Sequence, residues 1–327
     1  MTVLIVGATG YIGSALASEL RRQGVDVLTA SRGQQKTRAD HRQVDTTQVE
    51  SLMQAMQGAD IVINCVNGDA AAISEGARCL VEAAARSGVK KIIHMSSMAV
   101  YGFDSACMDE QSPVVSGGNW YADAKIQAES EMARFTQNGE VIILRIGCVA
   151  GRGSLQWVQR IGDLLKARRI GDLGRLGDGW SNLVAIDDVC QVVVQSVQRS
   201  LSPGRLDVFN LAAPDSPRWN SYFVDFAQLI DAAPPVRVSA MKLKVEAYAI
   251  APAALIYKKF QRRMRFLPAW NGTTLPPSLI KLFHSAGRLE TGCIDASFSI
   301  AWTHYDDTLR QGAAWYVDER HRSPTAR

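Results

Sequence analysis

The chain has 327 residues, of which 47% are hydrophobic and 21% charged, so it can bury one large core or one core with a smaller appended domain. Its net charge of +4 is small for this length, and no basic stripe with interleaved aromatic residues runs along its N-terminal half, which speaks against nucleic acid as a partner. The first strand begins at residue 2 or 3 and the six cysteines show no C-x-x-C spacing, so we expect a cytoplasmic protein with buried thiols, no signal peptide, no disulfide and no metal.

The strongest motif follows the first expected strand. Val3-Leu4-Ile5-Val6 runs into Gly7-Ala8-Thr9-Gly10-Tyr11-Ile12-Gly13, where a helix begins. The first glycine permits a tight turn, the second lets a pyrophosphate approach the backbone, and the third lets the helix pack on the strand. The motif predicts a dinucleotide site, although its spacing is G-x-x-G-x-x-G and the general fingerprint is G-x-G-x-x-G.

Strand-like and helix-like segments then alternate along the chain. After the first helix, which Gly24 ends, the expected strands are 25–29, 61–65, 91–96, 141–146 and 207–211, and the expected helices are 48–57, 75–86, 121–136 and 187–198. Apolar strands joined by helices need right-handed crossovers. The pattern therefore predicts an α/β fold with a doubly wound parallel sheet of the Rossmann type.

The GATGYIG motif and this alternation resemble the extended branch of the short-chain dehydrogenase/reductase superfamily, whose members are NAD-dependent epimerases, dehydratases and reductases. The resemblance covers nearly the whole chain and fades after about Leu229. It implies a nicotinamide dinucleotide cofactor. The residues expected to contact the cofactor are Gly7, Thr9, Gly10, Tyr11, Ile12, Gly13, Ser31, Arg32, Asp45, Cys65, Tyr121, Lys125 and Ile146.

The end of the second strand indicates which nicotinamide cofactor is used. An acid there would bind the ribose 2′-hydroxyl of NAD, but this chain has Ser31 and then Arg32, a planar cation suited to phosphate. We therefore expect NADP(H) in preference to NAD(H). The alternative is that Arg32 is only solvated and another acid binds the ribose. Asp45 resembles the position that contacts the adenine amine, or else it caps the helix that follows.

Tyr121 and Lys125 form a Y-x-x-x-K pair at the start of an expected helix, where the superfamily places its catalytic pair. Residues four apart lie on one helix face, so the ammonium is expected to lower the pKa of the phenol and make it a usable acid or base. The segment 95–102 resembles the family segment in which a Ser or Thr, four residues before the Tyr of V-Y-G, holds the substrate oxygen. Ser97 fits that position, and Ser96, which fits a turn cap better, is the alternative.

Two departures from the family pattern bear on the chemistry. Ile73 lies where many members carry an Asn that holds a relay water, and we do not count the nearby Asn67 or Ser74 as catalytic replacements. Met98 and Ala99 replace the acid pair of the dehydratases. Neither can transfer a proton, which speaks against dehydration.

The C-terminal third carries most of the prolines and is expected to be irregular. We expect an NAD(P)-binding Rossmann domain of residues 1–170 and 184–212 and a substrate-binding region of residues 171–183 and 213–327. Residues 247–257 are nearly all apolar, contain Pro252, and are too few to cross a bilayer, while 258–266 carry five cations. The segment is either an apolar wall of the substrate pocket with a solvated basic flank, or a contact through 247–266 with an anionic membrane or a lipid-linked or phosphorylated substrate.

These residues predict an oxidoreductase that moves a hydride between NADP(H) and a carbonyl or secondary alcohol. Ser97 would orient the reacting oxygen, Tyr121 would transfer the proton, and Lys125 would tune it and bind the ribose. The alternative is a nucleotide-sugar epimerase, although Gly147 and Cys148 replace an Asn that binds the sugar nucleotide in such enzymes. A non-catalytic dinucleotide sensor is a third hypothesis, against which the Y-x-x-x-K pair speaks. The resemblance further implies a small-molecule substrate and a homodimer paired through the helices near 75–86 and 121–136.

Overall fold

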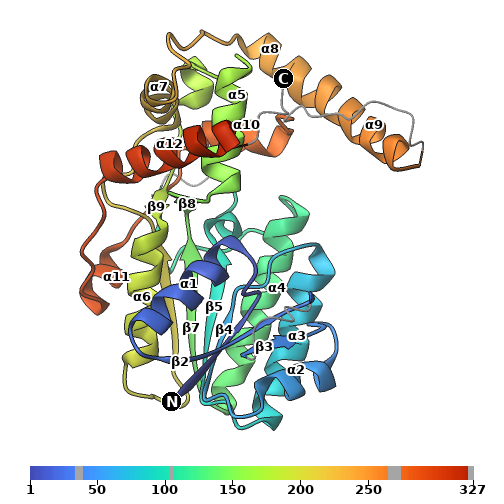
Figure 1. Cartoon of the computed structure of the whole chain (residues 1–327), viewed down its shortest axis with the longest axis vertical. Helices are drawn as coiled ribbons and strands as arrows, with labels where there is room; N and C mark the ends of the chain where they lie inside the picture. The colour runs from blue at the N-terminus through green and yellow to red at the C-terminus, as the bar shows by residue number, and fades with distance from the viewer. Residues whose placement is uncertain (34–39, 104–106, 264–273, 323–327) are drawn as a thin grey trace.

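The computed structural model of the chain describes residues 1–33, 40–103, 107–263 and 274–322 (Figure 1). Its centre is a seven-stranded sheet in the order β10-β7-β5-β4-β1-β2-β3, and every neighbouring pair in it is parallel. These strands are β1 (Thr2–Val6), β2 (Asp26–Ser31), β3 (His41–Gln43), β4 (Ile61–Asn64), β5 (Lys91–Ser97), β7 (Glu140–Ile146) and β10 (Leu206–Leu211). The predicted doubly wound fold is confirmed. Its strand order reverses between β1 and β4, and ligands bind at the carboxyl ends of the strands at such a reversal.

Helices cover both faces of this sheet, and each face has its own core. α1 (Tyr11–Arg22) and α6 (Ile186–Gln198) lie on one face, and α2 (Val49–Met56), α3 (Ala70–Arg86) and α4 (Trp120–Arg134) lie on the other (Figure 1). β1 shows why its sequence is continuously apolar. Val3 and Ile5 pack toward α1 and α6, while Leu4 and Val6 pack toward α2 and α3, so both faces of the strand are buried.

Several smaller elements complete the chain. Two two-stranded sheets pair β6 (Cys107–Met108) with β11 (Arg288–Leu289) and β8 (Cys148–Ala150) with β9 (Leu183–Ala185). The short helical turns are η1 (Met98–Tyr101), η2 (Phe135–Gln137), η3 (Leu155–Gln159), η4 (Gly174–Gly177) and η5 (Glu246–Ile250). The sequence analysis did not predict β3, β6, β8, β9 or β11, each of which has only two or three residues.

The expectation of an irregular C-terminal third is wrong, because that region is largely helical. Its helices, together with the preceding α5, are α5 (Arg160–Lys166), α7 (Trp219–Leu229), α8 (Ala240–Val245), α9 (Ala251–Arg263), α10 (Pro277–His284), α11 (Gly292–Ser297) and α12 (Tyr305–Arg322). No side chain in the described part of the chain caps α5, α7, α10 or α11. Tertiary packing stabilises them instead. The centres of the Trp219 and Phe283 rings lie 4.8 Å apart, and the ring of Tyr222 stacks on that of Phe226.

This aromatic cluster belongs to a third core that also contains Ile161 and Leu164 of α5. The predicted domain bounds, with a first break at residue 170, stay a prediction. The third core also contains Met98, Val100 and Cys148, which lie within three residues of the carboxyl ends of β5 and β7. It therefore lies next to the edge of the sheet at which a ligand is expected.

Candidate active site

The glycine-rich turn lies between β1 and α1. Gly7 has a φ of +85°, and a Cβ there would lie 2.7 Å from the carbonyl oxygen of Cys65, while a Cβ on Gly13 would lie 2.4 Å from the carbonyl oxygen of Gly7. Both positions therefore require glycine. Thr9 and Gly10 are exposed, and no side chain of the described residues caps the N-terminus of α1. Backbone N–H groups at this helix start are open to an anion, which fits the pyrophosphate of a dinucleotide.

Tyr11 and Ile12, the next two expected cofactor residues, are turned at least partly toward the protein. The hydroxyl of Tyr11 donates to the carbonyl oxygen of Ala150 at 3.2 Å, and a Cβ on Gly153 would lie 3.3 Å from its ring. Burial and the charge of Asp187 raise the pKa of this phenol. Tyr11 thus joins α1 to the end of β8, and Ile12 packs against the core beside α6.

Two further expected cofactor residues, Cys65 and Ile146, lie at the edge of the sheet formed by the carboxyl ends of its strands. Cys65 comes directly after β4, and burial raises the pKa of its thiol to about 12, so it stays protonated at neutral pH. Ile146 is buried at the end of β7. Their predicted contacts with a cofactor stay a prediction.

A pocket of about 650 Å³ opens beside β3 and the start of α3. Its lining residues are Arg32, Gln43, Val44, Asp45, Thr46, Thr47, Ser51, Asp69, Ala71 and Ala72. Pockets of this size accommodate drug-sized ligands. The structure thus brings together Arg32 and Asp45, the two residues expected at the adenosine end of the cofactor.

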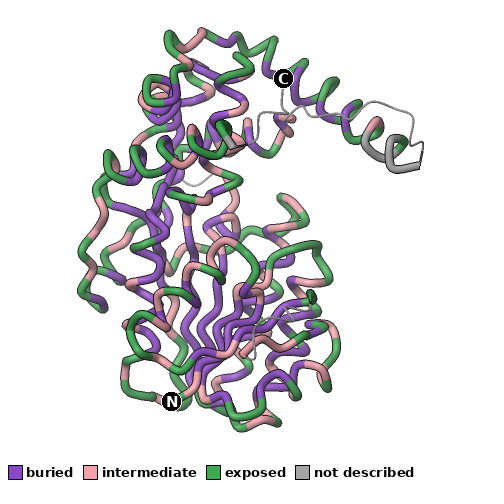
Figure 2. Tube along the Cα trace, viewed as in Figure 1, coloured by how far each residue is buried: buried purple, intermediate pink, exposed green. Residues whose placement is uncertain are grey.

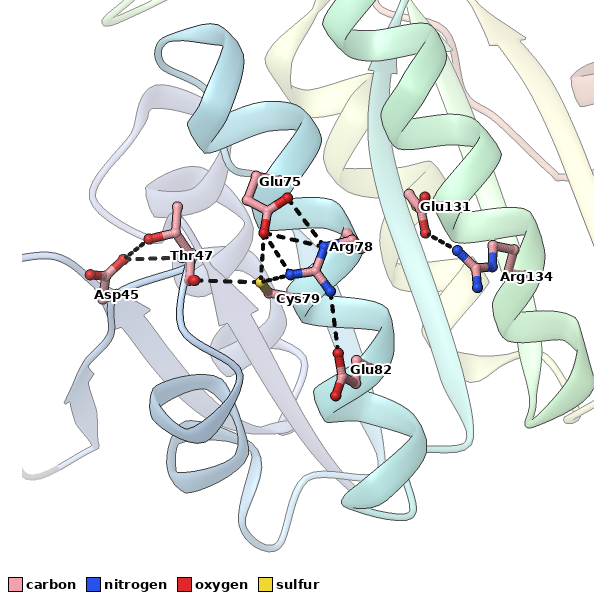
Figure 3. Close-up of polar contacts among 8 residues, drawn as sticks. All are labelled: Asp45, Thr47, Glu75, Arg78, Cys79, Glu82, Glu131 and Arg134. Atoms are coloured by element: carbon pink, nitrogen blue, oxygen red, sulfur yellow. Dashed lines mark hydrogen bonds and ion pairs between the residues drawn. The ribbon is translucent and has the colours of Figure 1, made fainter.

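Within this pocket Asp45 is held as a carboxylate. Its Oδ1 accepts the backbone N–H of Thr47 at 3.0 Å and the Thr47 hydroxyl at 2.8 Å (Figure 3). These two hydrogen bonds, followed by the charge of Arg32, lower the pKa of Asp45. The alternative role as a helix cap is wrong, because Gln48 is the N-cap residue of α2.

Ser31 is occupied by protein contacts. It is buried, its hydroxyl donates to the carbonyl oxygen of Gly33 at 3.1 Å, and it lies 3.1 Å from Nε2 of His41. His41 was not predicted, because it lies on a three-residue strand that has no sequence signature. Of the two residues expected beside the ribose, the exposed Arg32 is the one open to a ligand.

The expected catalytic residues meet where β5 ends and α4 begins. Asn119 caps α4, its Oδ1 accepting the backbone N–H of Tyr121 at 3.0 Å, and so fixes the first turn that carries the phenol. Tyr121 lies near enough to Ser97 for the Ser97 hydroxyl to lower the pKa of its phenol. One turn further along α4, Nζ of Lys125 lies 5.9 Å from the centre of the Tyr121 ring and donates to the carbonyl oxygen of Met95 at 2.8 Å.

The two candidate serines make different contacts. Ser96 is buried, and its hydroxyl donates to the carboxylate of Glu129. Ser97 contacts Tyr121 and also caps η1, its Oγ accepting the backbone N–H of Ala99 at 3.2 Å. The expectation that Ser96 is the better turn cap is therefore wrong, because Ser97 has both roles.

The charge state of the pair differs from the expectation. Burial raises the pKa of Tyr121, and the hydrogen bond from Ser97 lowers it by less. The expected lowering by Lys125 is not found, since the ammonium is directed to the carbonyl of Met95. Burial in turn lowers the pKa of Lys125 to about 8, against the opposing effects of Cys65 and Glu129. At neutral pH Tyr121 therefore keeps its proton, which makes it a proton donor.

A buried polar pair close to Lys125 was not predicted. Asn64 and His94 face each other on β4 and β5, and Nδ2 of Asn64 donates to Nδ1 of His94 at 3.1 Å because its Oδ1 already accepts the N–H of Val66. Burial and then the charge of Lys125 lower the pKa of His94, so the ring is neutral. A polar residue inside each of two buried strands is the signal that could have identified the pair.

The residues considered for a relay water make other contacts. Ile73 is buried in the core beside α3 and offers no polar atom. Asn67 accepts the N–H of Gly68, and the hydroxyl of Ser74 donates to the carbonyl oxygen of Ala70. These contacts are local to the start of α3.

Gly147, at the position where nucleotide-sugar enzymes often carry an Asn, has no room for a side chain. A Cβ there would lie 2.1 Å from the carbonyl oxygen of Asn182, which also accepts the N–H of Cys148 at 2.8 Å. The Cys148 side chain is fully buried in the third core. Neither residue can offer a polar group to a sugar nucleotide.

Comparisons with known proteins agree with this architecture. The family model "NAD dependent epimerase/dehydratase family" matches residues 3–212. The 3-diazoavenalumate denitrifying reductase of a Streptomyces species is 25% identical over 262 residues, which cover 72% of this chain and 83% of the relative. The 2-alkyl-3-oxoalkanoate reductase of Shewanella oneidensis is 25% identical over 221 residues, or 57% of each chain.

Solved structures share the fold over nearly the full length. The UDP-glucose 4-epimerase of Thermotoga maritima with UDP-glucose has a TM-score of 0.72 at 15% identity, covering 98% of this chain and 99% of that one. The glycine turn, the Ser97, Tyr121 and Lys125 arrangement and the family match lead to one conclusion. The chain belongs to the NAD-dependent epimerase/dehydratase family, within the extended short-chain dehydrogenase/reductase superfamily.

Proposed function

We propose that the protein is an NADP(H)-dependent reductase that converts a ketone or aldehyde to an alcohol. The observation that carries the proposal is the meeting of Ser97, at the end of β5, with Tyr121 in the first turn of α4 and Lys125 one turn further along, around a phenol whose pKa is raised by burial. A phenol that keeps its proton can donate it to the oxygen of a carbonyl substrate, and the Ser97 hydroxyl can hold that oxygen by a hydrogen bond. Reduction needs this proton and one hydride.

The cofactor would be held by the residues described above. The turn Gly7–Gly13 would bind the pyrophosphate, Arg32 and Asp45 would bind the adenosine end, and Lys125 would bind the nicotinamide ribose. When bound, the nicotinamide supplies the hydride. The low pKa of Lys125 does not remove its charge at neutral pH, so the ammonium remains a donor for ribose oxygens.

Two further observations favour net reduction over epimerisation. An epimerase must hold the nucleotide in place while the oxidised sugar rotates in the pocket. The crowded Gly147 has no room for a side chain that could bind the nucleotide sugar. Two relatives are named reductases, and the name of the Shewanella protein describes a ketone on an alkyl chain. The carbonyl substrate class is therefore the better supported.

We expect one NADPH to be consumed for each carbonyl compound reduced. A panel of ketones, aldehydes and nucleotide sugars would be tested with the purified protein, following the nicotinamide absorbance and the product configuration together. Inversion of a sugar carbon without net loss of NADPH would contradict the reductase and establish the epimerase. Binding of NADPH without turnover of either substrate class would favour the sensor.

Cofactor selectivity provides a second test. NADPH is expected to bind several-fold more tightly than NADH, and Arg32→Ala to weaken NADPH binding by about ten-fold or more, since a hydrogen bond to a charged group contributes about 1.5–3 kcal/mol. Titration of each cofactor against wild type and variant measures this. NADH affinity, which does not involve a 2′-phosphate, is the internal control, and equal wild-type affinities for the two cofactors would refute the NADP assignment.

The expected homodimer through α3 and α4 and the cytoplasmic location stay predictions, as do the small-molecule partner and the absence of a nucleic-acid partner. Both helices carry ion pairs between side chains of the same helix, as Figure 3 shows. Arg78 pairs with Glu75 on α3, and Arg134 pairs with Glu131 on α4. A dimer formed there would have to accommodate these charged groups.

A further inference from the structure

Residues 240–263 form one continuous helical segment that extends away from the rest of the chain (Figure 1). It comprises α8, η5 and α9, and we call it the projecting helix. Within the described ranges no helix has both the length and the apolar character that a bilayer-crossing segment needs. Unlike most helices in a folded protein, this one leaves large apolar side chains in solvent.

Most large apolar residues of the projecting helix are exposed, whereas Leu243 and three of its alanines are buried. Its alanines 247, 251 and 254 are at most 3% exposed, whereas its large apolar residues are mostly in solvent. These are Met241 (71%), Val245 (48%), Tyr248 (64%), Ile250 (37%), Leu255 (66%), Ile256 (58%) and Phe260 (51%). Figure 2 shows the exposed positions recurring along this segment. A cluster of this kind marks an interaction surface.

The spacing of these residues makes a stripe. Met241, Val245 and Tyr248 are related as i, i+4 and i+7, which places them on one side of a helix, and Ile256 and Phe260 are again four apart. Leu243 of the same helix is buried in the third core. The stripe is therefore what the projecting helix offers to a partner.

The charge of the same segment identifies the partner. In sequence the segment has a single carboxylate, that of Glu246, which is buried and ion-paired with Arg169. Its cations are Lys242, Lys244, Lys258, Lys259, Arg262 and Arg263. An apolar stripe on a strongly cationic helix is complementary to a surface that is apolar inside and anionic outside.

We propose that the projecting helix docks the protein on an anionic lipid bilayer, lying in the interface with its large apolar side chains among the acyl chains. A second copy of the chain fits less well, because a two-fold contact through this helix would bring the two cationic segments together. Because these large apolar side chains are exposed to solvent, they also favour membrane contact over the other interpretation of residues 247–266, an apolar wall of the substrate pocket.

Vesicle co-sedimentation with the full-length protein tests the proposal. Binding to phosphatidylcholine vesicles that contain phosphatidylglycerol is expected to be about ten-fold or more stronger than to phosphatidylcholine alone, and to fall in high salt. The double variant Leu255→Ser, Ile256→Ser is expected to bind about ten-fold more weakly than wild type. The matched control, Leu155→Ser with Leu201→Ser, changes two leucines that are 65% and 43% exposed elsewhere, and should bind as wild type does.

Three results of the binding assay would each overturn the proposal. They are no binding to either vesicle, equal binding to neutral and anionic vesicles, and undiminished binding by the Leu255→Ser, Ile256→Ser variant. Molar mass in solution would be measured for the same proteins. A wild-type oligomer that this variant converts to monomer would assign the stripe to a second copy of the chain and would also reject the membrane. Circular dichroism confirms that each variant is folded.

Discussion

Replacing Tyr121 with phenylalanine is expected to lower turnover by about a thousand-fold while leaving the fold and NADPH affinity unchanged, since a positioned general acid contributes about 10²–10⁴ in rate. The ring, which packs at the start of α4, is retained in this variant. The lost hydroxyl is the group that contacts Ser97 and holds the transferable proton. Steady-state rates with the identified carbonyl substrate, together with NADPH titration, would measure both expectations.

The same change elsewhere controls for this experiment. Tyr248→Phe removes a hydroxyl from a tyrosine that is 64% exposed on η5, and its rate in solution is expected to match wild type. Lys125→Ala should differ from both by weakening NADPH binding as well as turnover. A Tyr121→Phe variant that keeps wild-type rates would show that another group supplies the proton, and the mechanism proposed above would be wrong.

Local signals in the sequence were enough to predict every strand of the main sheet except β3, and the grouping of Ser97, Tyr121 and Lys125. Continuous apolar runs such as Val3–Val6 belong to strands buried on both faces. The alternation of these strands with helices predicted that the strands run parallel, as they do in the structure. Ser97, Tyr121 and Lys125 could be chosen because strand ends and helix starts meet at one edge of such a sheet. Their contacts confirm that these three side chains lie together.

Properties that depend on burial could not be predicted in this way. The sequence spacing of Tyr121 and Lys125 says nothing of how far each is removed from water, and it is desolvation that raises the pKa of the phenol and lowers that of the amine. The crowding of Gly147 by the carbonyl of Asn182 likewise involves residues far apart in the chain. The C-terminal helices were missed for a related reason, because α7 and α10 are stabilised by packing around Trp219 and lack the caps that mark a helix in sequence.

Glu129→Gln is expected to lower the free energy of unfolding by about 3–5 kcal/mol, the usual cost of removing one partner of a buried ion pair. The carboxylate of Glu129 accepts hydrogen bonds from two nitrogens of Arg145, from Nη2 at 2.8 Å and from Nε at 3.1 and 3.2 Å, and a further one from Ser96. Arg145 also donates to the hydroxyl of Tyr101 at 2.9 Å. This network joins β5, β7, η1 and α4, so the variant would leave the Arg145 guanidinium buried without its counter-charge.

The same substitution two residues further along α4, on the other side of the helix, provides the control. Glu131 lies on the same helix and pairs with Arg134 at 2.9 Å, but there the arginine side chain is 69% exposed (Figure 3). Glu131→Gln should cost no more than about 1 kcal/mol, because water replaces an exposed ion pair at little cost. Urea denaturation of both variants and wild type, followed by circular dichroism, gives the comparison. Equal losses for Glu129→Gln and Glu131→Gln would mean that the buried network does not stabilise the junction of β5 with α4, and that the site relies on other contacts such as the Asn119 side-chain cap.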